Sequence, residues 1–444
     1  MYEIKPLKNI NATVNIPADK SISHRALMLS SLAKGKTVIN NYLNSDDTLA
    51  TLACVQKMGV KVKHDKNNRT LIVEGRGLYF QRKSIVALNA GESGTTMRIL
   101  SGILCGQKFA IKFDAKPALK KRPMRRIVDP LKKFGADITG IEKKEKIYPP
   151  LTIKPVKKLI GGDFRLKVAS AQVKSALLLA GLYAKERTSV FEPMQSRDHT
   201  ERMLKLFGAN IQSKDRLCTI EPCSKLISPK NIFIPSDISS AAFFIVLGLI
   251  SKNSRIILKN ININHTRTGL LKVLERMGAK IEITDRVNDY EPYADLIITS
   301  SSLKGTVVNE EEIPLMIDEV PALCVAASFA STKTVIFGVK ELKVKETDRI
   351  ESMVRNLKAA GVNVWAGETK NKYGADDYMI IIDPTNDYHA ATFKSFNDHR
   401  TAMSMIVFAL GLGKMCKIDD VKCINKSFPD FLASIKKFYE DSKI

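Results

Sequence analysis

The chain has 444 residues, 44% hydrophobic and 26% charged, a composition typical of a globular protein and not of a disordered or fibrous one. Its longest apolar runs, residues 241–250 and 405–412, are too short to span a bilayer. Seven scattered cysteines without a disulfide or metal-binding spacing, and no apparent signal peptide, predict a soluble cytoplasmic protein. The formal charge of +24 indicates anionic ligands or a polyanion. Because the lysines are spread along the chain without an arginine-rich or RNA-binding motif, we favour diffuse surface charge together with a basic pocket over nucleic-acid binding.

The first motif, PADKSISHR at residues 17–25, precedes a predicted amphipathic helix at 26–34 that Gly35 closes. Its Asp and Ser residues are good N-cap types. Lys20 and Arg25 are cations at the N-terminal end of the helix, where the macrodipole disfavours them. Free N–H groups, hydroxyls and two cations predict either an anion site or a capped surface helix with solvated cations. This segment alone does not decide between them.

An amphipathic helix, a glycine and a short β-branched strand recur five times, and a sixth helix at 431–438 ends the chain. The glycines, each a suitable residue just past a helix end, are spaced by 76, 73, 70 and 83 residues: Gly59, Gly135, Gly208, Gly278 and Gly361. This period predicts an α/β protein with six copies of one unit. A second repeat, Ile-Pro-x-Asp at 16–19 and at 234–237, predicts two crossings between two halves of three units each.

Several further polar clusters stand before predicted helices. The cluster at 89–98 is glycine-rich, which lets backbone N–H groups approach an anion. Others precede predicted helices at 176–184, 322–330, 350–360 and 401–410. One such cluster is more often a helix cap than a site, but together they predict a closing cleft for several phosphates or carboxylates. Positive charge would come from Lys20, Arg122, Arg349, Arg400 and Lys426, and carboxylates for proton transfer from Asp318 and Glu346.

These motifs, in this order, resemble the EPSP synthase (3-phosphoshikimate 1-carboxyvinyltransferase) family over nearly the whole chain. The resemblance is carried by residues 17–25, 94–98, 121–124, 170–172, 196–199, 344–349, 397–400 and 426–430. It implies an α/β (α+β) fold of two similar domains, each an inverse α/β barrel of three βαβαββ units. Residues 1–19 and 235–444 would form the phosphoenolpyruvate side and residues 20–234 the shikimate 3-phosphate side, with the active site in the cleft between them.

The family transfers the enolpyruvyl group of phosphoenolpyruvate to the 5-hydroxyl of shikimate 3-phosphate by addition and elimination, a step of the shikimate pathway to chorismate and the aromatic amino acids. The resemblance implies a monomer without metal or cofactor, whose partners are these two anionic substrates. By resemblance, shikimate 3-phosphate is bound by Lys20, Ser21, Arg25, Ser170, Ala171, Gln172, Ser196, Asp318 and Lys345. Phosphoenolpyruvate is surrounded by Lys20, Gly94, Arg122, Gln172, Arg349, Arg400 and Lys426. Asp318 is the candidate acceptor of the 5-hydroxyl proton, and Glu346 the candidate donor to C3, with Lys20 as its rival.

The chain departs from the family pattern at four positions. Ala18 stands where Gly is usual, Glu92 where Asn is more common, Ala171 where some members have a hydroxyl, and Ile99 where some have Pro. The related UDP-N-acetylglucosamine enolpyruvyl transferases carry a reactive Cys on a loop corresponding to residues 116–126, which contain no Cys here. We expect the four departures at Ala18, Glu92, Ile99 and Ala171 to affect substrate affinity more than the reaction itself.

Overall fold

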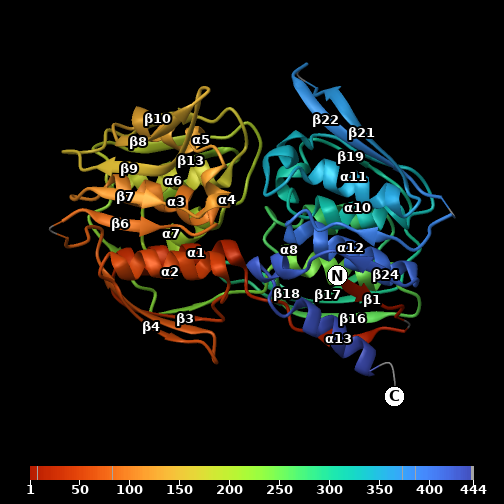
Figure 1. Ribbon diagram of the computed structural model, residues 1–444. Helices are drawn as coiled ribbons and strands as arrows, with labels where there is room; N and C mark the ends of the chain where they lie inside the picture. The colour runs from red at the N-terminus through yellow and green to blue at the C-terminus, as the bar shows by residue number, and fades with distance from the viewer. Residues whose placement is uncertain (8, 83, 373, 386, 442–444) are drawn as a thin grey trace. The chain divides into compact units, whose positions relative to one another are not determined.

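The computed structural model describes residues 1–7, 9–82, 84–372, 374–385 and 387–441 (Figure 1). The chain forms two compact units. We call Met1–Pro17 with Pro235–Ile444 unit 1, and Ala18–Ile234 unit 2. The first boundary therefore lies two residues before the position expected from the sequence.

Within the described residues, unit 2 contains three sheets. In the first, β14 (Leu226–Ile227) and β15 (Asn231–Phe233) pair with β3 (Ala33–Asn40), which is followed by β5 (Thr70–Arg76) and β4 (Lys61–Asp65). The second has the order β6 (Val86–Asn89), β7 (Ile111–Asp114), β9 (Lys146–Lys154) and β8 (Asp137–Lys143). The third has the order β10 (Gly162–Arg165), β11 (Thr188–Phe191), β13 (Leu217–Ile220) and β12 (Ile211–Lys214).

Unit 1 also contains three sheets within its described residues. One has the order β2 (Asn11–Val14), β16 (Arg255–Asn262), β18 (Tyr293–Thr299) and β17 (Lys280–Val287). Another has the order β19 (Val307–Val308), β20 (Thr334–Ile336), β22 (Asp376–Asp383) and β21 (Asn363–Lys370). The last has the order β1 (Tyr2–Ile4), β24 (Cys416–Ile418) and β23 (Thr392–Phe393).

One strand pattern repeats through both units. A parallel pair is followed by two antiparallel neighbours, as in β6, β7, β9 and β8. In the β1–β24–β23 sheet, β1 from the start of the chain pairs antiparallel with β24, where the other sheets have a hairpin. The six predicted βαβαββ repeats are therefore confirmed in the described chain, the sixth in modified form.

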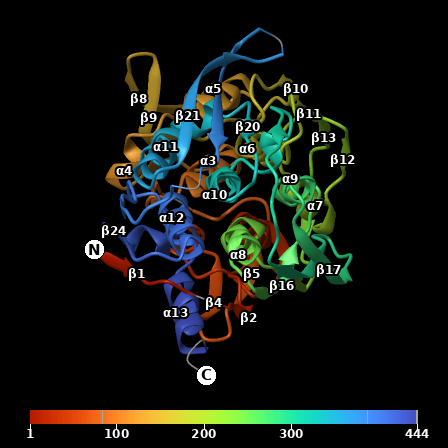
Figure 2. The same cartoon turned by 90° about the vertical axis from the view of Figure 1, so that its right-hand side faces the viewer.

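The helices divide into buried and amphipathic sets. Six helices are buried along most of their length: α1 (Lys20–Leu32), α3 (Gly94–Cys105), α6 (Ala171–Gly181), α8 (Ile238–Ile250), α10 (Val320–Ser328) and α12 (His399–Leu412). In unit 1, α8, α10 and α12 pack against one another inside the unit (Figure 2). No helix in the described part of the chain combines the length and apolarity that a bilayer crossing requires.

The amphipathic helices carry the predicted glycine repeat. They are α2 (Asp46–Lys57), α5 (Arg125–Lys133), α7 (His199–Leu206), α9 (Gly269–Arg276), α11 (Arg349–Ala359) and α13 (Phe431–Asp441). The glycine that follows each of the first five has φ between +81° and +90°, which a residue with a Cβ rarely adopts. Short helical segments complete the chain: α4 (Pro117–Lys120), η1 (Ile313–Leu315), η2 (Lys340–Val344) and η3 (Lys422–Lys426).

Two kinds of predicted helix boundary were wrong. Helix α1 ends at Leu32, and Gly35 lies inside β3 opposite Gly75, because pairing with β5 extends the strand back to the helix. The helix predicted to follow the polar cluster at 89–98 begins inside that cluster at Gly94, and the helix predicted at 176–184 begins at Ala171. The side chains of the residues just before them, Ser93 and Ser170, accept backbone N–H groups as N-caps. The polar motifs therefore form first helical turns instead of the loops before them.

Candidate active site

In unit 2, the first motif forms the N-terminal turn of α1. The carboxylate of Asp19 caps the helix by accepting the N–H of Ile22 at 2.9 Å. The next residue, Lys20, donates from Nζ to Asp47 at 3.1 Å, and their side chains are 19% and 16% exposed. An ammonium group has three protons, so Lys20 is held in place while it can still offer protons to an anion.

Arg25, on α1, forms hydrogen bonds that connect α1 to α6 and α7. Its Nε donates to Thr200 Oγ1 at 2.7 Å, its Nη2 to Ser175 Oγ at 2.8 Å, and its Nη1 to the carbonyl of Ser21 at 2.9 Å. Arg25 is 3% exposed. Its guanidinium therefore orients the α1 turn that carries Ser21 and brings positive charge beneath it.

The N-terminal turns of α3 and α6 are joined by side chains. Gln172 donates from Nε2 to Thr95 Oγ1 at 3.1 Å, and its Oε1 accepts from Arg98 Nη1 at 2.9 Å. The N-termini of two helices, where the macrodipoles favour an anion, therefore lie close together and are joined through the Arg98 cation. Arg98 lies in the predicted 94–98 motif but was not among the predicted site residues; its spacing of one helical turn from Gly94 was the available signal.

Gly94 lies against two guanidinium groups. A Cβ placed on this residue would be 2.9 Å from Arg98 Nη1 and 3.4 Å from Arg122 Nη1. Arg122 follows the short helix α4, and its backbone N–H donates to Leu119 at 2.9 Å. The absence of a side chain at residue 94 therefore lets both cations approach the first turn of α3, a suitable environment for a phosphate or carboxylate.

The remaining predicted residues of unit 2 lie at the start of α6 and before α7. Ser170 is the N-cap of α6, and Ala171 is its first residue. Ser196 is 5% exposed and donates its hydroxyl hydrogen to Glu192. All nine predicted residues of this half are in unit 2: Lys20, Ser21, Arg25, Gly94, Arg122, Ser170, Ala171, Gln172 and Ser196.

In unit 1, a single buried arginine binds three carboxylates. Arg349 donates from Nε to Asp398 at 3.0 Å, from Nη1 to Asp318 at 3.1 Å and from Nη2 to Glu346 at 2.6 Å. Burial alone would lower the pKa of Arg349, but the charges of Asp398, Glu346 and Asp318 outweigh burial and raise it above its ordinary value. The guanidinium therefore stays charged and fixes the positions of all three carboxylates.

A second arginine also contacts Asp318. Arg400 Nη1 donates to the Asp318 carbonyl at 3.0 Å, and its Nη2 lies 3.7 Å from the carboxylate. Asp398 caps α12 by accepting the N–H of Arg400. The side chains of Asp318 and Glu346 are 18% and 32% exposed, so both can be reached from solvent. Asp318 and Glu346 are therefore ion-paired carboxylates that a ligand can reach, as a proton acceptor must be.

The two predicted lysines of unit 1 lie at the ends of short helices. Lys345 is the C-cap of η2 and precedes α11, which Asp348 caps. Lys426 is the last residue of η3. Both lysines are half-buried. Unit 1 therefore contains Asp318, Lys345, Glu346, Arg349, Arg400 and Lys426.

Two of the departures from the family pattern are buried apolar residues. Ala18 is 2% exposed and Ile99 is 0% exposed, so each is accommodated inside unit 2. Glu92 lies in the turn before α3 and is half-buried. Its carboxylate therefore adds negative charge two residues before Gly94.

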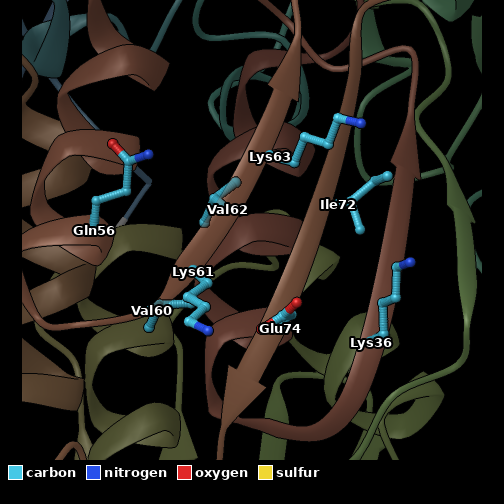
Figure 3. A pocket seen from close by; sticks show the side chains of 8 residues that line it. All are labelled: Lys36, Gln56, Val60, Lys61, Val62, Lys63, Ile72 and Glu74. Carbon is cyan, nitrogen blue, oxygen red and sulfur yellow. The ribbon is translucent and has the colours of Figure 1, made fainter.

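A pocket elsewhere on unit 2 contains none of the predicted residues. It has a volume of about 590 Å³ and lies over β3, β5 and β4 (Figure 3). Lys36, Glu74 and Lys61 are neighbours across these strands, so the pocket floor is a sheet face of alternating charge. In the described residues, no group of three His, Cys, Asp or Glu side chains could hold a metal ion.

Comparison with known proteins identifies the family. The model of the EPSP synthase (3-phosphoshikimate 1-carboxyvinyltransferase) family matches residues 4–435. The chain belongs to the EPSP synthase family. It is 45% identical over 436 residues to the 3-phosphoshikimate 1-carboxyvinyltransferase of Petrotoga mobilis and 42% identical over 437 residues to that of Geobacter metallireducens, covering 98% of this chain and of each relative.

A solved structure supports the same conclusion. The structure of EPSP synthase from Acinetobacter baumannii matches with a TM-score of 0.84 and 38% identity, over 98% of this chain and 97% of that one. The predicted family and the predicted α/β fold class are therefore confirmed.

Proposed function

We propose that the residues of units 1 and 2 described above act together in the 3-phosphoshikimate 1-carboxyvinyltransferase reaction of this family. Phosphoenolpyruvate donates its enolpyruvyl group to the 5-hydroxyl of shikimate 3-phosphate, and phosphate is released. The observation that carries the assignment of the catalytic residues is the binding of two solvent-accessible carboxylates, Asp318 and Glu346, by the buried Arg349.

Shikimate 3-phosphate would be bound mainly by unit 2. The N-cap Ser170, the first turns of α1 and α6 and the cation Lys20 offer donors to its phosphate and hydroxyls. The full proposed set is Lys20, Ser21, Arg25, Ser170, Ala171, Gln172 and Ser196, with Asp318 and Lys345 of unit 1.

Phosphoenolpyruvate carries a phosphate and a carboxylate, and both need cations. Arg122 beside Gly94 supplies one cation, and Arg349 and Arg400 beside Asp318 supply two more. Guanidinium groups bind such anions through paired hydrogen bonds. The full proposed set is Lys20, Gly94, Arg122, Gln172, Arg349, Arg400 and Lys426.

In the addition step, Asp318 takes the proton of the 5-hydroxyl while the oxygen of that hydroxyl forms a bond to C2 of phosphoenolpyruvate. Glu346, in its protonated form, donates a proton to C3, with the Lys20 ammonium group as the alternative donor, so that a tetrahedral intermediate forms. In the elimination step, C3 returns its proton to the group that donated it, the C2–O bond to phosphate breaks, and the leaving phosphate takes the proton held by Asp318, so that the enolpyruvyl ether remains and both side chains regain their starting state. The surrounding cations stabilise the negative charge on the carboxylate and on the leaving phosphate.

Release of inorganic phosphate tests this proposal. The purified protein is mixed with shikimate 3-phosphate and phosphoenolpyruvate, and each substrate is omitted in turn as a control. We expect phosphate and enolpyruvyl product in equal amounts only when both substrates are present. A folded protein that releases no phosphate under any condition would contradict the proposal.

We also propose that the protein works as a monomer in the cytoplasm. All seven cysteines are free, which suits a reducing compartment. Light scattering of the purified protein measures its mass, and a stable dimer would contradict the monomer.

A further inference from the structure

A buried charged cluster lies behind the N-terminal turn of α6. Lys174, on α6, contacts Glu192 at 2.6 Å and Glu201 at 2.7 Å. The three side chains are only 5%, 2% and 6% exposed. Charged side chains are rarely buried to this degree unless they are paired. The cluster connects α6 to the segment after β11 and to the first turn of α7.

Glu192 connects this cluster to a proposed substrate residue. One of its oxygens accepts the hydroxyl hydrogen of Ser196, and the other accepts the backbone N–H of Ser196 at 3.3 Å. Both contacts span four residues of irregular chain between β11 and α7. The carboxylate of Glu192 therefore sets the position of Ser196, and Lys174 sets the position of that carboxylate.

Lys174 is also close in sequence to the other proposed residues of this region. It lies two residues after Gln172 on α6 and four residues after Ser170, the N-cap of that helix. The contact from Lys174 to Glu192 thus links the start of α6, which carries Ser170 and Gln172, to the segment that carries Ser196.

We propose that Lys174 and Glu192 are positioning residues for shikimate 3-phosphate, which hold Ser196 in register with Ser170 and Gln172. This inference rests on the proposed assignment of those three residues to that substrate. Neither Lys174 nor Glu192 touches the substrate. They act by keeping the donors of two separate chain segments in one fixed arrangement before the substrate binds.

The charges of the cluster give a second reason why Lys174 should favour the binding of shikimate 3-phosphate. Two carboxylates and one ammonium group carry a net charge of about −1 when all are ionised. Without Lys174, the carboxylates of Glu192 and Glu201 would lack the cation that both contact, and like charges in a poorly hydrated region repel strongly. Lys174 therefore orders the Ser196 segment and also shields the phosphate from both carboxylates.

Four variants separate positioning from general stability. Glu192→Gln keeps the shape of the side chain but loses one acceptor and its charge contact with Lys174. Lys174→Met removes the charge, and Lys174→Arg restores it. Glu201→Gln is the matched control, because it weakens the other contact of Lys174 and touches no proposed substrate residue. Burial raises the pKa of the Glu201 carboxyl and the charge of Lys174 opposes this, so Lys174 stabilises the ionised form of Glu201.

The measurements are the KM for each substrate, kcat and the thermal unfolding midpoint. We expect Glu192→Gln and Lys174→Met to raise the KM for shikimate 3-phosphate by roughly ten- to a hundredfold, the range for losing a contact to a charged group. The KM for phosphoenolpyruvate should change less than about twofold, and Lys174→Arg should recover part of the loss. Glu201→Gln should lower the unfolding midpoint without this change in KM.

Several results would overturn the inference: equal changes in both KM values, no change in either, or a Glu201→Gln variant that raises the KM for shikimate 3-phosphate as much as the others. If Lys174→Met does not fold, Glu192→Gln decides the question. The wild-type protein is assayed first. An inactive, folded wild type contradicts the proposed function, whereas an active wild type with unaffected variants contradicts only the positioning role.

Discussion

His24 makes the stability of unit 2 depend on pH by an amount that can be calculated. Its side chain is fully buried in α1, with Nδ1 2.7 Å from Thr51 Oγ1 and, among the described residues, no hydrogen-bond partner at Nε2. Burial lowers the pKa of His24 from 6.5 to about 3; the charge of Asp47 opposes this, while Lys20 and Arg25 lower the pKa further. The imidazole is therefore neutral in the folded protein at neutral pH.

The sign of the effect follows from proton binding. In the unfolded chain His24 takes up a proton near pH 6.5, and in the folded protein only near pH 3. Between these values the unfolded state binds more protons, so stability falls as the pH falls. With these two pKa values, lowering the pH from 7 to 5 costs about 2 kcal/mol from this one group.

Urea unfolding at pH 7 and at pH 5 measures this difference. The comparison protein is His24→Asn, which does not titrate and whose amide can still contact Thr51. Other groups titrate alike in both proteins, so subtracting the two pH dependences isolates His24. We expect the wild type to lose about 2 kcal/mol more than His24→Asn. The same pH dependence in both proteins would refute the reasoning.

Three further predictions concern the site. Asp318→Asn should lower kcat roughly 10²- to 10⁴-fold, as for loss of a general base. The KM for phosphoenolpyruvate should change much less. An unchanged kcat in the phosphate-release assay would exclude Asp318 from proton transfer. Gly94→Ala should raise the KM for phosphoenolpyruvate about tenfold, or by about 1.4 kcal/mol, because its methyl group would lie 2.9 Å from Arg98 Nη1. The KM for shikimate 3-phosphate should rise less, because Arg98 contacts that site only through Gln172; an unchanged KM for phosphoenolpyruvate would contradict the assignment of Gly94. Arg349→Met should destabilise the protein by about 3 kcal/mol, because the fully buried carboxylate of Asp398 would lose its cation. A thermal unfolding midpoint equal to that of the wild type would contradict this prediction.

The repeat architecture could be predicted because it depends on local signals. An amphipathic helix, a glycine and a β-branched strand are readable within about fifteen residues, and the glycines do adopt positive φ after their helices. Helix starts were predicted too late at α3 and α6, because polar residues in a first turn look like a loop in the sequence. Their role became clear only from the caps at Ser93 and Ser170.

Residues that act through other residues were harder to predict from the sequence. Arg98 contacts Gln172 across 74 residues of sequence, and Lys174 contacts Glu192 and Glu201 from α6. Neither arginine nor lysine stands out in a chain with 70 Lys and Arg residues. Burial distinguishes them, and burial depends on how distant segments pack. The joint action of both units on one substrate pair stays a prediction.

By itself, the sequence determined the helix–glycine–strand units, the polar motifs and the family to which they point, because each depends on neighbouring residues. Only the tertiary structure decided which charges meet. Arg349 binds Asp318 and Asp398, which are 31 and 49 residues away in sequence, and is held among them with almost no exposure to water. Burying a charge is costly unless a partner is brought to it, so these contacts require the packed helices α10, α11 and α12 that bring them together.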